Sequence, residues 1–367
     1  MLPETIKYRL FDYMSVQTMR YVENVPIKKA TGLVKDVYDQ VQKDFFINGT
    51  ITSQSKVPEL MAGMWSAGRE ILLVTDKEER TVKEAIGGTL SYLNDCPYCA
   101  DMFVSLVHGG GEKDAASNIM FENEDAIKDE SLRKKLLWVR DATLVNKEGV
   151  FRLPFTQEQI PEVLGALLMS SYVNRYSHVV MDGSPVIPPF GLQKIKDFML
   201  KMFGRELHVT TRQILEPGTS LNLLPKASLP DDLYWSAPNQ RIADAISRWA
   251  AAIDREVVKT VSPEIRELVE SSLQKWDCKR MPLSRRWVEE EIEGLEGKDR
   301  AHARLALVMA KGSYHFDETL MDDVLSYGAQ EEDIIRILAW ASFTGARRLT
   351  ELTADTLGLN NEVLVAV

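Results

Sequence analysis

Apolar residues recur along most of the chain at the three- and four-residue spacing of amphipathic helices, without a convincing series of alternating strand positions. This pattern predicts an all-α fold. The expected helices form two series, separated by a region punctuated by Pro and Gly. The first series is expected near residues 27–46, 57–74, 78–93, 96–109, 131–145 and 156–176, and the second near 240–256, 263–276, 284–294, 298–311, 317–327 and 330–356.

The region between the two series has two pieces. Residues 183–189 end the first series, and residues 216–239 precede the second. The later piece contains Leu223-Leu224-Pro225 and Leu233-Tyr234-Trp235, which are too apolar for a solvated linker. We therefore expect a first helical unit over 1–205, an ordered connector over 206–239 that packs across the body, and a second, degenerate unit over 240–367.

The two series also show a weak internal resemblance. Residues 155–160 lead into an amphipathic segment from Leu164 to Arg175, much as residues 329–334 lead into one from Leu338 to Arg348. Each is a turn followed by a helix that ends with arginine. An internal repeat and a chance similarity of two amphipathic helices explain this pattern equally well.

Composition narrows the class of protein. The chain has 367 residues, of which 45% are hydrophobic and 27% charged, as in an ordinary soluble globular protein. The net charge of −10 argues against nucleic acid or an anionic membrane as a main partner. No uninterrupted apolar stretch approaches the roughly 18 residues of a spanning helix. Residues 1–11 mix charges into their apolar positions without a signal-peptide core, so we expect a cytoplasmic location.

The strongest candidate chemistry is the segment Cys96-Pro-Tyr-Cys99, which holds two of the three cysteines. Asp95 can cap a helix that begins near Cys96, and Pro97 suits the first turn of that helix. A thiol there faces unpaired N–H groups and the positive end of the helix dipole, so we expect its thiolate to be favoured. The two sulfurs, three residues apart, lie on one face and can form a disulfide after a small adjustment. The third cysteine, Cys278, falls where a degenerate copy of this segment would lie and is expected to be structural.

Four other residues near the cysteines are candidate site residues. Glu84 lies twelve residues before Cys96; buried beside the thiols it would hold and release a proton, whereas on an exposed face it would be an ordinary solvated carboxylate. Tyr98 either lines the site as a hydrogen-bond donor or packs as an ordinary interior tyrosine. Phe103 is most simply a core residue that would make a pocket more apolar. His108 precedes three glycines and can end a helix by interacting with its carbonyls.

Metal and cofactor chemistry is not expected. Zinc would need more ligands than Cys96, Cys99 and the badly spaced His108. Covalent haem attachment requires a histidine directly after the second cysteine, where Ala100 stands. A thioredoxin-like fold requires alternating strands and helices, which the pattern lacks.

The spacing of Glu84, eleven further residues and Cys96-Pro-Tyr-Cys99 resembles the signature of the carboxymuconolactone decarboxylase and alkylhydroperoxidase D-like superfamily. Later segments resemble two-repeat members of this superfamily, so that the resemblance spans roughly residues 25 to 357. The resemblance implies an all-α fold of repeated helical units, a homo-oligomer, and either thiol peroxidase or cofactor-free lyase chemistry. The later segments are Asn174-Arg175, residues 184–188, residues 217–221, residues 339–342 and residues 346–348.

Carried over residue by residue, the resemblance makes Cys99 the peroxidatic thiol and Cys96 the resolving thiol, with Glu84 in the proton relay. The superfamily pattern then has a histidine four residues after the second cysteine, where this chain has Phe103. His108 lies nine residues beyond Cys99, about two and a half helical turns on and on a different side of the helix, so it cannot simply replace that group.

We therefore expect a thiol-dependent oxidoreductase that reduces small hydroperoxides through the Cys96/Cys99 dithiol and is regenerated by an external dithiol reductant. Without a histidine at 103, its peroxidase chemistry should be slower than that of members with the full relay. Two alternatives remain open. One is a cofactor-free lyase or oxygenase acting on a small aromatic or lactone metabolite, and the other is a non-catalytic assembly or binding protein with a decayed site.

Overall fold

The computed structural model describes residues 18–143, 153–184 and 193–359. Within these ranges every regular element is a helix, and the chain pairs as extended backbone only in an isolated bridge between Met19 and Met181. The all-α fold expected from the helical spacing is confirmed. Residues 185–189, which belong to the first Pro-rich piece, lie outside the described residues.

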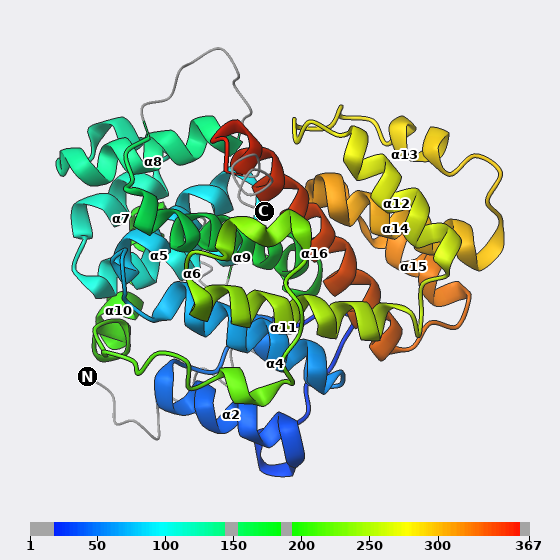
Figure 1. Cartoon of the computed structure of the whole chain (residues 1–367), viewed down its shortest axis with the longest axis horizontal. Helices are drawn as coiled ribbons and strands as arrows, with labels where there is room; N and C mark the ends of the chain where they lie inside the picture. Colours follow the sequence, from blue (N-terminus) through cyan, green and yellow to red (C-terminus); the bar gives the residue numbers. More distant parts are fainter. Residues whose placement is uncertain (1–17, 144–152, 185–192, 360–367) are drawn as a thin grey trace, which may run out of the picture.

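Helices are named as in Figure 1. The elements up to the connector are η1 (Ile27–Lys29), α2 (Gly32–Asp44), α3 (Gly49–Thr52), α4 (Pro58–Gly68), the π-helical turn η2 (Arg69–Leu73), α5 (Arg80–Leu93), α6 (Pro97–Gly110), α7 (Lys113–Met120), η3 (Glu124–Ala126), α8 (Glu130–Thr143), η4 (Gln157–Gln159), α9 (Ile160–Val180) and α10 (Gln193–Thr211). Those that follow are η6 (Leu221–Leu223), η7 (Asp231–Ser236), α11 (Gln240–Val257), α12 (Pro263–Lys275), α13 (Arg286–Glu291), α14 (Gly297–Gly312), η8 (Ser313–His315), α15 (Glu318–Ser326) and α16 (Glu331–Thr356).

Most of the expected helices are present within a few residues of their expected ends. Helices α3, α7 and α10 are additional to the expected ones, and α10 lies in the region interpreted as a break between the two series. Helix α10 packs along α6, the helix that carries the two cysteines. The expected boundary at residue 205 therefore falls inside a helix that belongs to the surroundings of the candidate site.

Helix α9 is the centre of the molecule (Figure 1). Nearly all of its residues are buried, because α5 and α6 pack on one side of it and α16 on another. A helix that is apolar on all sides is typical of such a buried position. Both α9 and α16 are preceded by a capping box, formed by Thr156 with Gln159 and by Gln330 with Asp333. The division of the chain into two repeats stays a prediction.

The two helical series share one core. Trp249 of α11 is fully buried and contacts Tyr172 of α9 and Phe343 of α16, with ring centroids 4.7 and 4.4 Å apart. Helix α4 approaches the same indole so closely that a Cβ at Gly63 would lie 2.7 Å from it. Helices of the second series therefore complete the packing of the first, while α12 to α15 form a lobe beside it (Figure 1).

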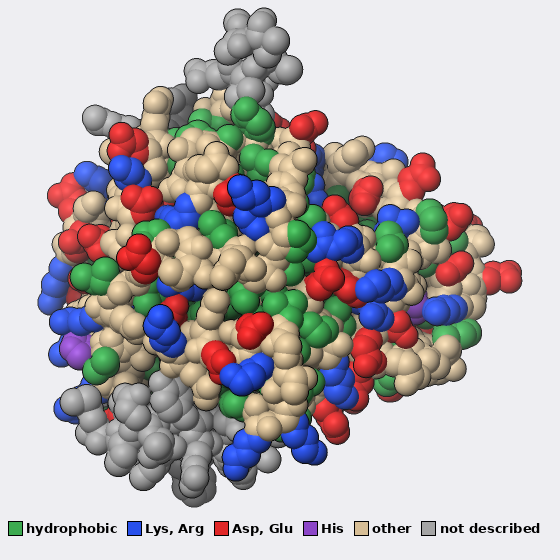
Figure 2. Space-filling view, turned by 60° about the horizontal axis from the view of Figure 1, so that its bottom comes forward, with side chains coloured by type: hydrophobic (Ala, Val, Ile, Leu, Met, Phe, Trp, Pro, Cys, Tyr) green, Lys and Arg blue, Asp and Glu red, His purple; other side chains and the backbone are tan. Residues whose placement is uncertain are grey.

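The segment after α10 packs against the rest of the molecule, since Leu215, Leu224, Leu233 and Trp235 are buried. It is held partly by Glu70 of the π-helical turn, whose carboxylate accepts hydrogen bonds from the Gly218 N–H at 2.9 Å and the Ser220 hydroxyl at 2.8 Å. On the face shown in Figure 2, acidic and basic side chains are interspersed. Among the described helices, none is both long enough and apolar enough to cross a membrane.

Candidate active site

A tight turn joins α5 to α6 and places the two cysteines. Asp95 adopts a left-handed backbone conformation with φ of 52°, which aspartate tolerates better than most residues, and the Cys96 N–H then donates to the Ser91 carbonyl at 2.9 Å. Helix α6 begins at Pro97 with Cys96 as its N-cap. The expectation that Asp95 caps this helix is therefore wrong: α6 has no side-chain cap, and the Asp95 carboxylate forms an ion pair with Arg280 instead.

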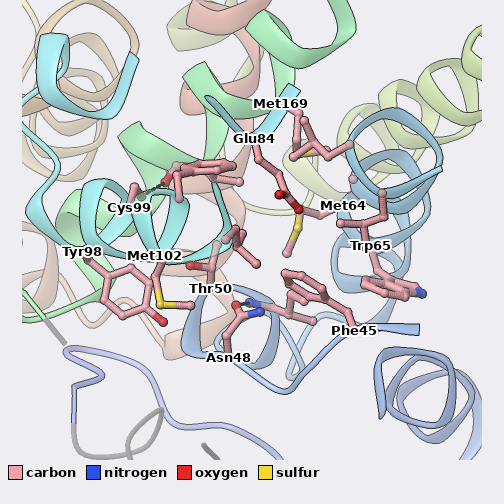
Figure 3. A pocket seen from close by; sticks show the side chains of 17 residues that line it. Phe45, Asn48, Thr50, Met64, Trp65, Glu84, Tyr98, Cys99, Met102 and Met169 are labelled. Atoms are coloured by element: carbon pink, nitrogen blue, oxygen red, sulfur yellow. Dashed lines mark hydrogen bonds between the residues drawn. The ribbon is translucent and has the colours of Figure 1, made fainter. Parts of the chain in front are cut away.

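A cavity of about 110 Å³ lies between α5, α6, α9 and the α4–η2 helix (Figure 3). Four of the candidate residues line it: Glu84, Tyr98, Cys99 and Phe103. Most of the other lining side chains are apolar, including Met64, Trp65, Leu72, Met169 and Val173. The sequence-predicted glutamate and the second cysteine thus meet at one small apolar space. Cys96 and His108 do not line it.

The Cys99 thiol is 3% exposed and donates a hydrogen bond of 3.6 Å to the Val173 carbonyl of α9. Burial raises the pKa of Cys99 well above its usual value; a hydrogen bond with the Cys96 thiol raises this pKa further and one with the Ser177 hydroxyl lowers it. The expectation that the helix N-terminus favours the Cys99 thiolate is therefore wrong for this resting state. Both cysteines are free thiols and both are buried.

Glu84 is 1% exposed, and its carboxylate points toward the middle of the cavity (Figure 3). Its Oε1 accepts a hydrogen bond of 2.8 Å from Arg80 Nε, whereas its Oε2 has no hydrogen-bond partner among the described residues. Burial raises the pKa of Glu84, and the positive charges of Arg80 and Lys83 oppose this rise. The carboxylate is thus placed where it can exchange a proton with a group in the cavity.

Tyr98 and Phe103 also face this space from α6. Burial raises the pKa of Tyr98, an effect that the Gly49 backbone and the Thr50 hydroxyl only partly oppose, so the phenol is neutral. Phe103, at the position where the sequence resemblance predicts a histidine, packs against α5, and a Cβ at Gly87 would lie 2.5 Å from its ring. An apolar ring therefore replaces the expected relay group.

His108 is buried on another side of α6, against α10. A Cβ at Gly204 of α10 would lie 2.9 Å from His108 Nδ1, which shows how closely the two helices approach there. Cys278 lies in the second series, with burial raising its pKa to about 12. Neither residue belongs to the cavity.

Sequence reasoning missed Arg80, which stands four residues before Glu84 on α5. Its side chain is 4% exposed, and besides binding Glu84 it donates from Nη1 to the Thr210 carbonyl at 3.0 Å. An arginine and a glutamate four residues apart on a helix commonly pair, so this spacing was readable in the sequence. The third nitrogen of the guanidinium, Nη2, is buried without a hydrogen-bond partner among the described residues.

The π-helical turn η2 was also missed, and it forms one wall of the cavity through Leu72 and Leu73. Its buried Arg69 binds Asp44 at 2.7 Å and Glu70 at 2.6 Å, which fixes the turn from within. Such single π turns are frequent at functional sites, but no local sequence signal marks this one. In the part of the chain that the structure describes, no group of three or more His, Cys, Asp or Glu residues could hold a metal ion.

Comparison with known proteins adds one similarity. The chain is 26% identical over 332 residues to an alkyl hydroperoxide reductase of Mycobacterium tuberculosis, which covers 90% of this chain and 94% of that protein. The similarity therefore extends beyond the first helical series. No family model matches the chain, and no solved structure matches it.

Proposed function

We propose that this protein is a thiol-dependent peroxidase that reduces a small hydroperoxide through Cys99 and Cys96. The observation that carries the proposal is that the Cys99 thiol and the Glu84 carboxylate line the same small cavity, with Cys96 three residues before Cys99 at the N-cap of α6. The similarity to an alkyl hydroperoxide reductase supports the same class of chemistry.

The proposed cycle has three steps. The Cys99 sulfur attacks the terminal oxygen of ROOH, the O–O bond breaks, and the products are a sulfenic acid on Cys99 and the alcohol ROH. The Cys96 thiol then attacks the Cys99 sulfur, forming the disulfide and releasing water. An external dithiol reduces this disulfide by thiol–disulfide exchange, which restores both thiols.

Glu84 is the proposed proton carrier of the first step. Only Glu84, Tyr98 and Cys99 among the lining residues are ionisable, and burial raises the pKa of Tyr98, which leaves the phenol protonated. Glu84 would accept the proton of the Cys99 thiol as the sulfur attacks and release it to the departing alkoxide. Because burial also raises the pKa of Cys99, we expect slow oxidation at neutral pH.

The cavity suits a compact organic hydroperoxide. Its volume of about 110 Å³ is somewhat below the ~150 Å³ of an engineered apolar cavity that binds benzene. A short alkyl group can contact Met64, Leu72 and Met169, while the peroxide oxygens lie between Cys99 and Glu84. The lyase or oxygenase alternative concerns a small aromatic or lactone metabolite; an aromatic substrate larger than benzene would need the cavity to expand.

The test is to oxidise the reduced protein with one equivalent of tert-butyl hydroperoxide, block the remaining thiols and map the products by mass spectrometry. We expect a Cys96–Cys99 disulfide in the unmodified protein, and a sulfenic acid on Cys99 that dimedone traps in Cys96→Ser. Cys99→Ser should stay reduced at position 96, and Cys278→Ser should behave like the unmodified protein. Oxidation that misses Cys99, or turnover of a lactone that survives Cys96→Ser, would reject the peroxidase.

A further inference from the structure

We infer that Arg80 is the positioning residue of this site: it fixes the Glu84 carboxylate so that Oε2 stays free to carry protons in the cavity. This role rests on the proposed peroxidase function, in which Glu84 is the proton carrier. Arg80 itself does not line the cavity and acts through Glu84.

The contacts of Arg80 hold its guanidinium in one place. Nε donates to Glu84 Oε1 at 2.8 Å within α5, and Nη1 donates to the Thr210 carbonyl at 3.0 Å, near the end of α10. The guanidinium also lies over the ring of Phe45, 5.8 Å from its centroid, and Phe45 lines the cavity. Helix α10 and the segment after α2 therefore fix the arginine, which in turn fixes the glutamate.

The pairing leaves one polar atom unused on each partner. Arginine and carboxylate often pair through two parallel hydrogen bonds, which would engage both carboxylate oxygens. Here Glu84 Oε2 and Arg80 Nη2 are both buried without a hydrogen-bond partner among the described residues. Buried polar atoms are costly to leave unpaired, so an acceptor held free at the cavity fits a group that binds a transferable proton.

Arg80 is also the cation hydrogen-bonded to Glu84. Lys83 is near in the sequence, but its ammonium binds Glu162 of α9 at 2.6 Å. Across the cavity, Cys99 and Tyr98 of α6 are neutral at rest, and the lining residues of α4, η2, α9 and residues 45–51 carry no charge. Without Arg80, a buried carboxylate in these surroundings would take up a proton and cease to act as a base.

The consequence is a defined change in pH dependence. Burial raises the pKa of Glu84 and Arg80 lowers it, so removing Arg80 moves the ionisation of Glu84 to higher pH. The acidic limb of the pH–rate profile, along which Glu84 becomes ionised and able to act as a base, must also move to higher pH. A shift of one pKa unit corresponds to about a tenfold lower fraction of ionised Glu84 on the acidic side.

The experiment measures the single-turnover rate of Cys99 oxidation by tert-butyl hydroperoxide against pH. In Arg80→Met we expect the acidic limb to lie at higher pH than in the unmodified protein, and Glu84→Gln should lack this limb. Arg80→Lys keeps the positive charge, so its acidic limb should lie between those of Arg80→Met and the unmodified protein. If Arg80→Met does not fold, this smaller shift in Arg80→Lys is measured in its place. Arg248→Met is the matched control, because Arg248 is a buried arginine of α11 outside the cavity and should leave the profile in place.

Infrared spectroscopy separates this inference from the peroxidase itself. The carboxyl C=O band of Glu84, identified by its loss in Glu84→Gln, should titrate at higher pH in Arg80→Met whether or not the protein reduces hydroperoxides. An unchanged band and an unchanged rate profile in Arg80→Met would overturn the positioning role. If the thiols of the unmodified protein are not oxidised by the hydroperoxide while the band still shifts in Arg80→Met, the peroxidase is rejected and the coupling between Arg80 and Glu84 stands.

Discussion

At the scale of single residues, two effects on Cys99 oppose each other. The thiol is the third residue of α6, where the helix dipole stabilises an anion by about 0.3–1 kcal/mol. Burial acts against the anion, and shifts of up to 3–5 pKa units at about 1.4 kcal/mol each are known for fully buried groups. Burial therefore has the larger effect, and the pKa of Cys99 lies above its usual value.

This balance predicts slow alkylation of Cys99. Its reaction with iodoacetamide, followed by peptide mass spectrometry, should be slow at pH 7 and should rise with pH beyond the range of an ordinary thiol. In Ser177→Ala the rate at a given pH should fall, because the hydrogen bond from Ser177 lowers the pKa of Cys99. Fast alkylation that levels off below pH 8 would contradict the prediction.

The sequence is more informative about which residues line the cavity than about their protonation states. Glu84 and Cys99 line one cavity because α5 and α6 are consecutive helices, whereas Cys96 is not among its lining residues, and the catalytic roles of all three stay predictions. The sign of the Cys99 pKa shift depends on what α9 and the α4–η2 helix bring to the thiol from far along the chain. Arg80 was readable four residues from Glu84, but its importance depends on the Thr210 carbonyl of α10.

At the scale of helices, close packing of α5 on α6 depends on glycine. A methyl group at Gly87 would lie 2.5 Å from the Phe103 ring, whereas one at Gly68 would meet the flexible end of Met169 at 3.5 Å. Glycine also explains why α10 was missed: Gly204 interrupts its helical pattern, yet this residue allows α10 to approach the Ser105 carbonyl of α6. A residue that weakens a helix locally can thus be required for its packing.

We predict that Gly87→Ala destabilises the protein. Overpacking against Phe103 costs about 1–3 kcal/mol, whereas the higher helix propensity of alanine contributes only ~1 kcal/mol, so the free energy of unfolding should fall. Urea unfolding monitored by circular dichroism should show a lower midpoint for Gly87→Ala, recovered in part by Phe103→Leu in the same chain. Gly68→Ala is the control and should be neutral or slightly stabilising; equal midpoints for both single variants would contradict the argument.

At the scale of the whole molecule, the second helical series reaches the turn at Asp95, directly before Cys96. Arg280 pairs with the Asp95 carboxylate and lies over the Tyr314 ring, 4.2 Å from its centroid. His178 of α9 donates to the Asp95 carbonyl at 3.0 Å, so the residue before Cys96 is held from two sides. The sequence predicted two helical series, but contacts between residues 185 positions apart depend on the shared core around Trp249 and could not be read from either series.

These contacts lead to a prediction about reduction of the proposed disulfide. Cys96 is 1% exposed, so an external dithiol can reach a Cys96–Cys99 disulfide only when the turn at Asp95 opens. The Asp95–Arg280 pair is half-exposed and is worth at most about 1 kcal/mol, so Arg280→Ala should scarcely change the urea midpoint. The same 1 kcal/mol makes local opening of the turn about fivefold more frequent, so dithiothreitol should reduce oxidised Arg280→Ala about threefold to fivefold faster than the oxidised unmodified protein.

The control is Arg286→Ala, which removes a comparable exposed pair with Glu290 in the same lobe and should leave the reduction rate unchanged. Equal rates for the two variants would mean that the second series does not control access to the thiols.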